Sequence, residues 1–215
     1  MTILSLLLKC FTTLHNSRTR KKGFVGIKLD MAKAYNRIEW SFLNSTLLTI
    51  GFPPKLVQTI MLCVSTVSFS VLVNGQPSTI MHPNRGIRQG DPLSPYLFIL
   101  CANVLSSLIT KKQDEGLIQG IAIATEAPKI THLFFANDSI IFCRARKEEV
   151  NHILEVLNEY QRASGQQINM SKFQMMFITN LDSVIKKSFR DILDMPITTN
   201  ISKYLFRYPY SDREI

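Results

Sequence analysis

The chain has 215 residues, a formal net charge of +9 at pH 7 and a hydrophobic content of 46%. Its length and apolar content predict one large domain, or a small domain with an appendage, and exclude an intrinsically disordered chain. The excess of cations favours a polyanionic partner, and a basic protein that binds no polyanion is the alternative.

The cysteines are scattered through apolar surroundings without a Cys-x-x-Cys pair, at Cys10, Cys63, Cys101 and Cys143. This pattern predicts buried, reduced thiols and excludes a zinc site or a disulfide framework. The apolar start of the chain is too short for a signal peptide and lacks a basic leader. No stretch approaches the roughly 20 apolar residues that span a bilayer. We therefore expect a soluble intracellular chain with no membrane partner.

The first predicted elements are an amphipathic helix over residues 2–16, a basic turn over 17–23 and an apolar strand over 23–30. The cations of the turn either contact phosphates or belong to a solvated loop. The strand ends on Asp30, and an acid there is either a helix N-cap or a functional ligand. The sequence after Asp30 is predicted to turn into a helix that runs to Leu48.

Turn residues divide the next part of the chain. Gly51 ends the helix, and a second helix that starts with two prolines is predicted over 54–64. The alternation of residues 67–73, followed by Asn74-Gly75, predicts a β-hairpin whose return strand covers about 78–82.

A loop over residues 84–95 is punctuated by glycine and proline and leads into a long apolar helix, with Ser94 as N-cap and Pro95 in its first turn. Arg88-Gln89-Gly90 before this helix is either a plain connector or a cradle for a base pair or phosphate. The predicted buried face of the helix comprises Leu97, Phe98, Cys101, Val104, Leu105 and Leu108.

The rest of the chain is predicted to contain strands over 117–124, 130–135 and 139–144, a helix over 148–163, a strand over 173–178 and a helix over 182–193. Asn137 and Asp138 lie in a tight turn between two of these strands, as metal ligands or as residues suited to the turn. This order of elements predicts an α+β fold, a ferredoxin-like antiparallel sheet backed by helices.

In such a sheet, Asp30 and the turn that holds Asp138 lie at neighbouring strand ends. Paired carboxylates repel each other, and a divalent cation is the usual remedy. Two Mg²⁺ ions stabilise both the attacking and the leaving oxygen of an in-line phosphoryl displacement. Together with the basic charge, this arrangement indicates nucleotidyl transfer or nucleic-acid cleavage.

Four segments resemble motifs of one family, the non-LTR (LINE-type) retrotransposon reverse transcriptases, in a plant-like form. Lys28–Trp40 resembles their first palm motif and Arg85–Pro95 their second. Phe135–Asp138 stands where the family carries Phe/Tyr-Ala-Asp-Asp, and Gly165–Lys172 resembles the segment that follows. The resemblance covers about residues 20–180 and implies a reverse-transcriptase palm with partial fingers.

The resemblance also implies a domain organisation. Residues 1–22 would be partial fingers and a lead-in helix, and residues 23–180 the palm with an intervening fingers hairpin. Residues 181–215 would be a degenerate tail at the start of the primer-grip and thumb region, where the chain is truncated.

The resemblance implies catalytic and metal-binding roles at five positions. Asp30 would bind two Mg²⁺ ions with help from the Met31 carbonyl, and Asp138 and Asn137 would complete the metal site. Lys172 would lie near the triphosphate as a proton donor to the departing pyrophosphate.

Further positions would bind the nucleotide. Tyr35 would lie under the incoming sugar and exclude a 2′-hydroxyl, which makes the product DNA. Gln89 and Gly90 would line the nascent base pair, where glycine permits a close backbone approach. Lys33 and Arg88 would meet template or nucleotide phosphates. The implied partners are an RNA template, a DNA primer and dNTPs, in the nucleus if the chain is expressed.

Two positions depart from the family pattern. Asn137 replaces an aspartate that binds metal directly, and Asn36 stands where the family has an aspartate that is not a ligand. Loss of one electrostatic contact to a transition state costs about 3 kcal/mol, or about a hundredfold in rate. The sequence therefore predicts an RNA-directed DNA polymerase domain whose activity in this copy is impaired or lost, a pseudoenzyme of a decayed element.

Three alternatives remain open. The chain is a non-catalytic nucleic-acid-binding remnant if it binds in a salt-dependent way without extending a primer. A metal-dependent nuclease built from Asp30 and Asp138 lacks a water-activating base in the sequence. A translation that is never expressed has no function.

Overall fold

The computed structural model describes residues 23–122, 127–135, 138–177, 189 and 197–198. Its helices are α2 (Trp40–Ile50), α3 (Pro54–Ser65), α4 (Ser94–Asp114) and α5 (Lys147–Ser164). Its strands are β1 (Phe24–Ala32), β2 (Leu72–Val73), β3 (Gln76–Pro77), β4 (Ile121–Ala122), β5 (Lys129–Ile130), β6 (His132–Phe135), β7 (Asp138–Arg144), β8 (Gln167–Ile168), β9 (Gln174–Phe177) and β10 (Ile197–Thr198).

The chain divides into two compact units. One unit contains the described residues of 1–30, 112–152 and 170–215, and the other contains residues 31–111 and 153–169. We call them the sheet unit and the helical unit.

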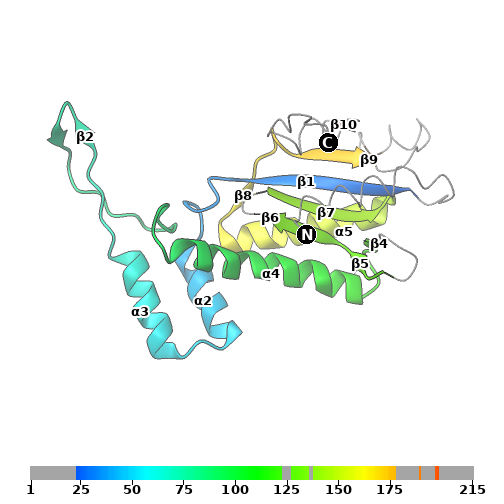
Figure 1. Ribbon diagram of the computed structural model, residues 1–215, viewed down its shortest axis with the longest axis horizontal. Helices are drawn as coiled ribbons and strands as arrows, with labels where there is room; N and C mark the ends of the chain where they lie inside the picture. The colour runs from blue at the N-terminus through cyan, green and yellow to red at the C-terminus, as the bar shows by residue number, and fades with distance from the viewer. Residues whose placement is uncertain (1–22, 123–126, 136–137, 178–188, 190–196, 199–215) are drawn as a thin grey trace, which may run out of the picture. The chain divides into compact units, whose positions relative to one another are not determined.

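The sheet unit is built around β1, which lies between β7 and β9 and is antiparallel to both (Figure 1). β6 pairs with β7 on one side, and β10 runs parallel to β9 on the other. β1, β6, β7 and β9 thus have the chain order and spatial order of a ferredoxin-like sheet. This arrangement confirms the predicted α+β class with an antiparallel sheet.

Burial explains why β1 is central. Val25, Ile27 and Leu29 are fully buried, as are Ile141 and Phe142 of β7. Strands that are covered on both faces carry near-continuous apolar runs, because alternate residues both point into a core. The apolar run after the predicted turn at 136–139 therefore corresponds to a core strand, whereas residues 132–134 before the turn are half-buried.

β1 is longer than predicted, and the first helix begins later. The strand continues through Ala32, where Met31 and Ala32 pair with β8. Residues 33–37 form turns, and α2 begins at Trp40. The expected helix directly after Asp30 was wrong, because strand pairing takes up the backbone groups that a helix would use.

The predicted end of α2 and the predicted starts of α3 and α4 are confirmed. Gly51 ends α2 in the left-handed conformation with φ 99°, and Pro54 begins α3. α4 begins at Ser94 and buries the face that comprises Leu97, Phe98, Cys101, Leu105 and Ile109. Val104 and Leu108, which were expected on this face, are half-buried.

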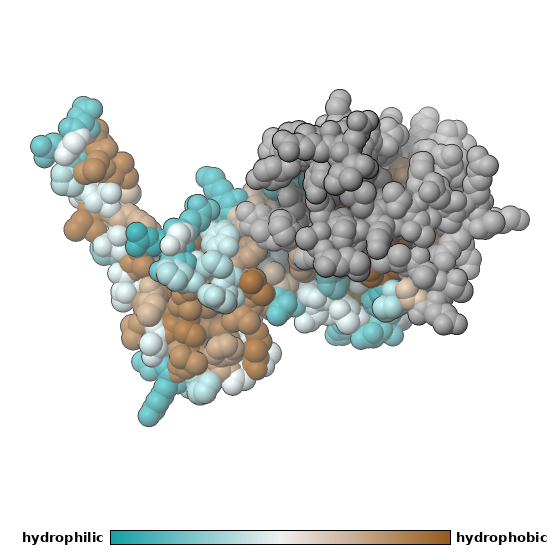
Figure 2. All heavy atoms as spheres, viewed as in Figure 1, coloured by the Kyte–Doolittle hydropathy of each residue, from teal (hydrophilic) through white to brown (hydrophobic). Residues whose placement is uncertain are grey.

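The hairpin of β2 and β3 has the predicted turn, but its strands are short, and β3 ends at Pro77, before the return strand predicted at about 78–82. Asn74 and Gly75 both have positive φ, 51° and 79°, as a two-residue hairpin turn requires. Beyond β2 and β3, pairing is limited to a bridge between Phe69 and Met81. The apolar side chains of the hairpin are exposed, and Figure 2 shows them as brown spheres. A two-stranded ribbon cannot bury its faces by itself.

α4 is long and apolar enough to cross a membrane by length and composition, which the sequence reading did not anticipate. A single helix of this kind is weak evidence for a membrane span, because a core helix of a soluble protein passes the same test. The absence of a membrane partner stays a prediction.

The described cysteines differ in environment. Cys101 and Cys143 are buried as predicted, whereas Cys63 is exposed on α3 and that expectation was wrong. Burial raises the pKa of the Cys101 thiol to about 12. Burial, with a smaller contribution from the Glu149 charge, raises the pKa of Cys143 as well. Cys10 lies outside the described residues, as do the predicted helix over 2–16 and nearly all of the predicted helix over 182–193.

Candidate functional site

Two acids are backbone partners at one end of the sheet unit. In the antiparallel register of β1 and β7, Asp30 is the partner of Asp138. Residues directly opposite on antiparallel strands have their Cβ atoms about 5 Å apart. The juxtaposition predicted from the sequence is therefore present in the backbone. Asn137, at the neighbouring position in the turn, lies outside the described residues.

Lys172 makes an ion pair with Asp30. Its Nζ lies 3.4 Å from Oδ1 and 3.3 Å from Oδ2 of the carboxylate. The Asp30 side chain is only 17% exposed, whereas that of Lys172 is 64% exposed. The single ammonium group of Lys172 thus contacts both oxygens of the Asp30 carboxylate. Because the lysine side chain is mostly exposed, it can move away from the carboxylate into solvent.

Within the described part of the chain, no three His, Cys, Asp or Glu side chains are grouped so that they could hold a metal ion. A metal at this end of the sheet would therefore rely on the acids at the ends of β1 and β7 together with backbone or amide oxygens. Carboxylate and carbonyl oxygens are the ligands that Mg²⁺ prefers. The residues present fit Mg²⁺ by their chemistry.

In the helical unit, Tyr35 lies in the turn that follows β1. Its ring stacks on Phe98 of α4, with ring centroids 4.8 Å apart and ring planes 10° apart. Lys33 is exposed and has a φ of 50°, an uncommon value for a residue other than glycine. Met31 is buried at the end of β1. The sequence predicted a role for all three residues but not the support that Phe98 provides.

A buried polar network holds the same turn. Gln166 donates from Nε2 to the Ala34 carbonyl over 2.9 Å. The hydroxyl of Tyr160 donates to Oε1 of Gln166 and lies 3.3 Å from the Cys101 carbonyl. Burial is the main cause that raises the pKa of Tyr160, so its hydroxyl stays protonated at neutral pH. The sequence did not predict that Tyr160 and Gln166 form this network. The available signal was a glutamine directly after Gly165, the glycine that ends the helix.

The loop before α4 is tied to the turn of Tyr35. The Gly86 nitrogen donates to the Ile38 carbonyl, and the Ile87 nitrogen donates to the Tyr35 carbonyl over 2.9 Å. Trp40 Nε1 donates to the Gly86 carbonyl over 2.7 Å. A Cβ at Gly86 would lie 2.8 Å from the Asn36 oxygen, so only glycine fits this position.

Two of the predicted cradle residues of this loop, Arg88 and Gln89, line a hollow. Arg88, Gln89 and Gly90 are exposed, and Gly90 has a φ of 86°. A hollow of about 450 Å³ is lined by this loop and by residues near the end of α3, among them Asn36, Cys63, Phe69, Arg88, Gln89 and Asp91. Its volume is in the range of small-ligand pockets. Arginine, amide and apolar side chains together suit a nucleotide.

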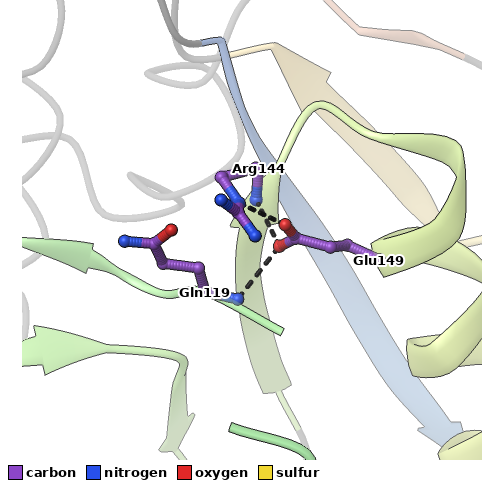
Figure 3. Close-up of polar contacts among 3 residues, drawn as sticks. All are labelled: Gln119, Arg144 and Glu149. Carbon is purple, nitrogen blue, oxygen red and sulfur yellow. Dashed lines mark hydrogen bonds and ion pairs between the residues drawn. The ribbon is translucent and has the colours of Figure 1, made fainter. Parts of the chain in front are cut away.

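A buried carboxylate fixes the opposite end of β7. Glu149, in the first turn of α5, is 3% exposed and accepts hydrogen bonds from the backbone nitrogens of Gln119 and Arg144, at 2.9 and 3.1 Å (Figure 3). It also pairs with the guanidinium of Arg144. The sequence reading missed this contact. An acid in the first turn of a helix was the signal, but such residues are usually exposed.

Comparison with known proteins gives a consistent result. The family model described as reverse transcriptase (RNA-dependent DNA polymerase) matches residues 4–205. An uncharacterized mitochondrial protein of Arabidopsis thaliana is 52% identical over 68 residues, which are 32% of this chain and 56% of that protein.

Two relatives from retrotransposable elements match over more of the chain. The Pol polyprotein of type-1 element R2 from Popillia japonica is 29% identical over 155 residues, 72% of this chain and 24% of that protein. A 149 kDa protein of transposon TX1 from Xenopus laevis is 26% identical over 91% of this chain and 14% of its own length. The chain thus spans about a quarter or less of these two relatives.

Solved structures of similar fold include telomerases. Apo telomerase of Candida tropicalis, truncated from its C-terminal domain, has a TM-score of 0.62 and 16% identity over 84% of this chain and 35% of that one. Telomerase of the same organism in complex with a TWJ fragment of telomeric RNA has a TM-score of 0.55 and 17% identity, over 81% and 29% of the two chains. At these identities the likeness concerns the fold alone.

Proposed function

Because this chain belongs to the reverse transcriptase (RNA-dependent DNA polymerase) family, we propose that it is the palm of an RNA-directed DNA polymerase from a non-LTR (LINE-type) retrotransposon. The observation that carries the proposal is the register that makes Asp30 the partner of Asp138, with Lys172 paired to Asp30. An acidic strand end in a basic chain suits phosphoryl transfer on a polyanion.

In this proposal Asp30, Asp138, the Asn137 amide oxygen and the Met31 carbonyl hold two Mg²⁺ ions. The ions, when bound, stabilise the charge that develops on the attacking and leaving oxygens. Lys172 leaves Asp30 when metal binds and is then available to give a proton to pyrophosphate. Its exposure and its position on the carboxylate support both roles.

Nucleotide binding is assigned to the helical unit. Tyr35 excludes a 2′-hydroxyl from the incoming sugar, and Gln89 and Gly90 line the nascent base pair. Arg88 and Lys33 contact phosphates of template or nucleotide. The exposure of Lys33, Arg88 and Gln89, and the hollow beside the loop, support these assignments. The partners are then an RNA template, a DNA primer and dNTPs, in the nucleus if the chain is expressed.

We expect this copy to be a weak polymerase or a pseudoenzyme. Asn137 supplies a neutral oxygen where the family has a charged ligand, so two dications are held with one negative charge fewer. The expected cost is about 3 kcal/mol, or about a hundredfold in rate. A second candidate, a nucleic-acid-binding remnant without catalysis, is favoured by the net charge of +9 together with Asn137.

Primer extension on an RNA template, with Mg²⁺ or Mn²⁺, tests the proposal. The chain is compared with its Asn137→Asp variant, and Asn36→Asp serves as the matched control, because position 36 also departs from the family but is not a ligand. We expect Asn137→Asp alone to raise extension about a hundredfold. An active parent contradicts the predicted impairment. If neither form extends a primer and both bind an RNA–DNA hybrid, the binding remnant is supported instead.

A further inference from the structure

We propose that Gln166 and Tyr160 are positioning residues for Tyr35, and that through Tyr35 they set the preference for deoxyribonucleotides over ribonucleotides. This inference rests on the proposed function. It assigns a task to a buried network that the polymerase motifs leave unexplained, and that network lies wholly within the helical unit.

The first step concerns the peptide planes on both sides of Tyr35. The Ala34 carbonyl accepts from Gln166 Nε2 at 2.9 Å, and the Tyr35 carbonyl accepts from the Ile87 nitrogen at 2.9 Å. Because each peptide unit is planar, two fixed carbonyls determine both backbone dihedrals of the residue between them. The direction of the Cα–Cβ bond of Tyr35 is then set by two hydrogen bonds, one of which comes from Gln166.

The second step concerns the orientation of the Gln166 amide. Its two ends have nearly the same shape, so only its partners decide which end faces Ala34. The Ala34 carbonyl can only accept, so it faces the amino group, and the Tyr160 hydroxyl donates to Oε1 and holds the amide in this orientation. Tyr160 and Gln166 are each 1% exposed and Ala34 is 2% exposed, so water does not replace either bond.

The third step concerns the close approach of the two segments. Gly165 has a φ of 72°, and a Cβ there would lie 2.7 Å from the Arg37 oxygen. The Glu39 nitrogen donates to the Ser164 carbonyl at 2.9 Å. The end of α5 therefore contacts the chain at and just after the C-terminal end of the turn that holds Tyr35. Gln166, the next residue, contacts the N-terminal side of Tyr35 at the Ala34 carbonyl.

The final step is chemical. A ring that rejects a hydroxyl by steric exclusion must be placed to a fraction of an ångström, since an opening of about 1 Å admits the larger sugar. Phe98 supports one face of the Tyr35 ring by stacking. The hydrogen bond from Gln166 to the Ala34 carbonyl determines how far the Tyr35 ring extends beyond Phe98. Loss of this hydrogen bond should therefore reduce the preference for deoxyribonucleotides without abolishing nucleotide binding.

The test uses the full chain and three variants. Gln166→Met keeps the length of the side chain but removes the amide, and Tyr160→Phe removes the single hydroxyl. The matched control is Gln161→Met, which removes an amide that accepts from the Ile168 nitrogen in the same segment but does not contact Ala34. Dissociation constants for dGTP and GTP are measured on a primer–template with Ca²⁺, and the Tyr35 ring is followed by ¹⁹F NMR of 3-fluorotyrosine at position 35.

We expect Gln166→Met and Tyr160→Phe to reduce the preference for dGTP by about tenfold and to shift or broaden the fluorine resonance. Gln161→Met should change neither. An unchanged resonance in both network variants, or an unchanged preference despite a shifted resonance, would overturn the inference. If the unchanged chain binds no nucleotide, the proposed function is contradicted. The fluorine resonance of the variants still shows in that case whether the network positions Tyr35. If Gln166→Met does not fold, Tyr160→Phe alone decides.

Discussion

The β1–β7 pair and the β2–β3 hairpin were both predicted from apolar strand patterns, yet they differ in almost every structural respect. β1 pairs with β7 over seven residues and is buried, whereas β2 and β3 pair over two residues each and are exposed. The hairpin has the better turn signal, and its turn forms as predicted. Local turn chemistry thus determines where the chain reverses, and burial determines how far the strands extend.

The largest expected difference is between two isoleucines. Ile27 of β1 is fully buried and Ile80 beside the hairpin is 65% exposed. Ile27→Ala should lower the free energy of unfolding by about 2–5 kcal/mol, because it removes buried methylene groups and leaves a cavity. Ile80→Ala should change it by about 0.5 kcal/mol or less. Urea denaturation followed by circular dichroism measures both, and equal effects would contradict the comparison.

The next effect concerns the anchor of β7. Glu149→Gln removes the charge that pairs with Arg144 and should destabilise the chain by about 1–3 kcal/mol. Its neighbour Glu148 is exposed in the same helical turn, so Glu148→Gln is the matched control and should be almost neutral. Thermal unfolding of the two variants makes the measurement. A Glu149→Gln variant as stable as the parent would show that β7 needs no such anchor.

A smaller and local effect is expected at the hairpin turn. Gly75→Ala forces a side chain into a φ of 79° and should weaken the hairpin by about 1 kcal/mol, or about fivefold in its opening equilibrium. Amide hydrogen exchange of residues 69–81 should rise, and exchange in β1 should stay constant. Gln76→Ala is the control in the adjacent strand. Faster exchange throughout the chain would mean that the hairpin contributes to global stability.

The end of β1 offers a functional contrast to the hairpin. Lys172→Met removes the cation that competes for the Asp30 carboxylate. Because exposed ion pairs contribute less than about 1 kcal/mol, Mn²⁺ should bind about threefold more tightly. Lys129→Met, at an exposed lysine of β5, should leave the affinity unchanged. Titration followed by electron paramagnetic resonance makes the measurement, and weaker binding in Lys172→Met would show that the lysine does not compete with metal.

The smallest effect is expected on the hairpin surface. Leu72 is 70% exposed, so Leu72→Lys should change the free energy of unfolding by less than about 0.5 kcal/mol. Removing this apolar contact surface should raise solubility. Differential scanning calorimetry and the solubility limit measure the two effects. A clear loss of stability would mean that Leu72 is covered in solution.

Features that depend on neighbours in sequence were readable from the sequence. The end of α2 at Gly51, the start of α3 at Pro54, the turn at Asn74-Gly75 and the start of α4 at Ser94 follow from backbone preferences of single residues. The order of strands and helices also determined the α+β class, and the motifs indicated the family. The roles of the predicted site residues stay predictions.

Only the tertiary structure decided where β1 ends and what holds Tyr35. The strand continues to Ala32 because β8 pairs with it from far along the chain, which overrides the helical pattern after Asp30. Gln166 reaches Ala34 across 132 residues, and the buried Glu149 accepts from the backbone nitrogen of Gln119, which is 30 residues away. Such contacts carry no periodic or local signal, since their free energy comes from satisfying polar groups that only the folded chain brings together.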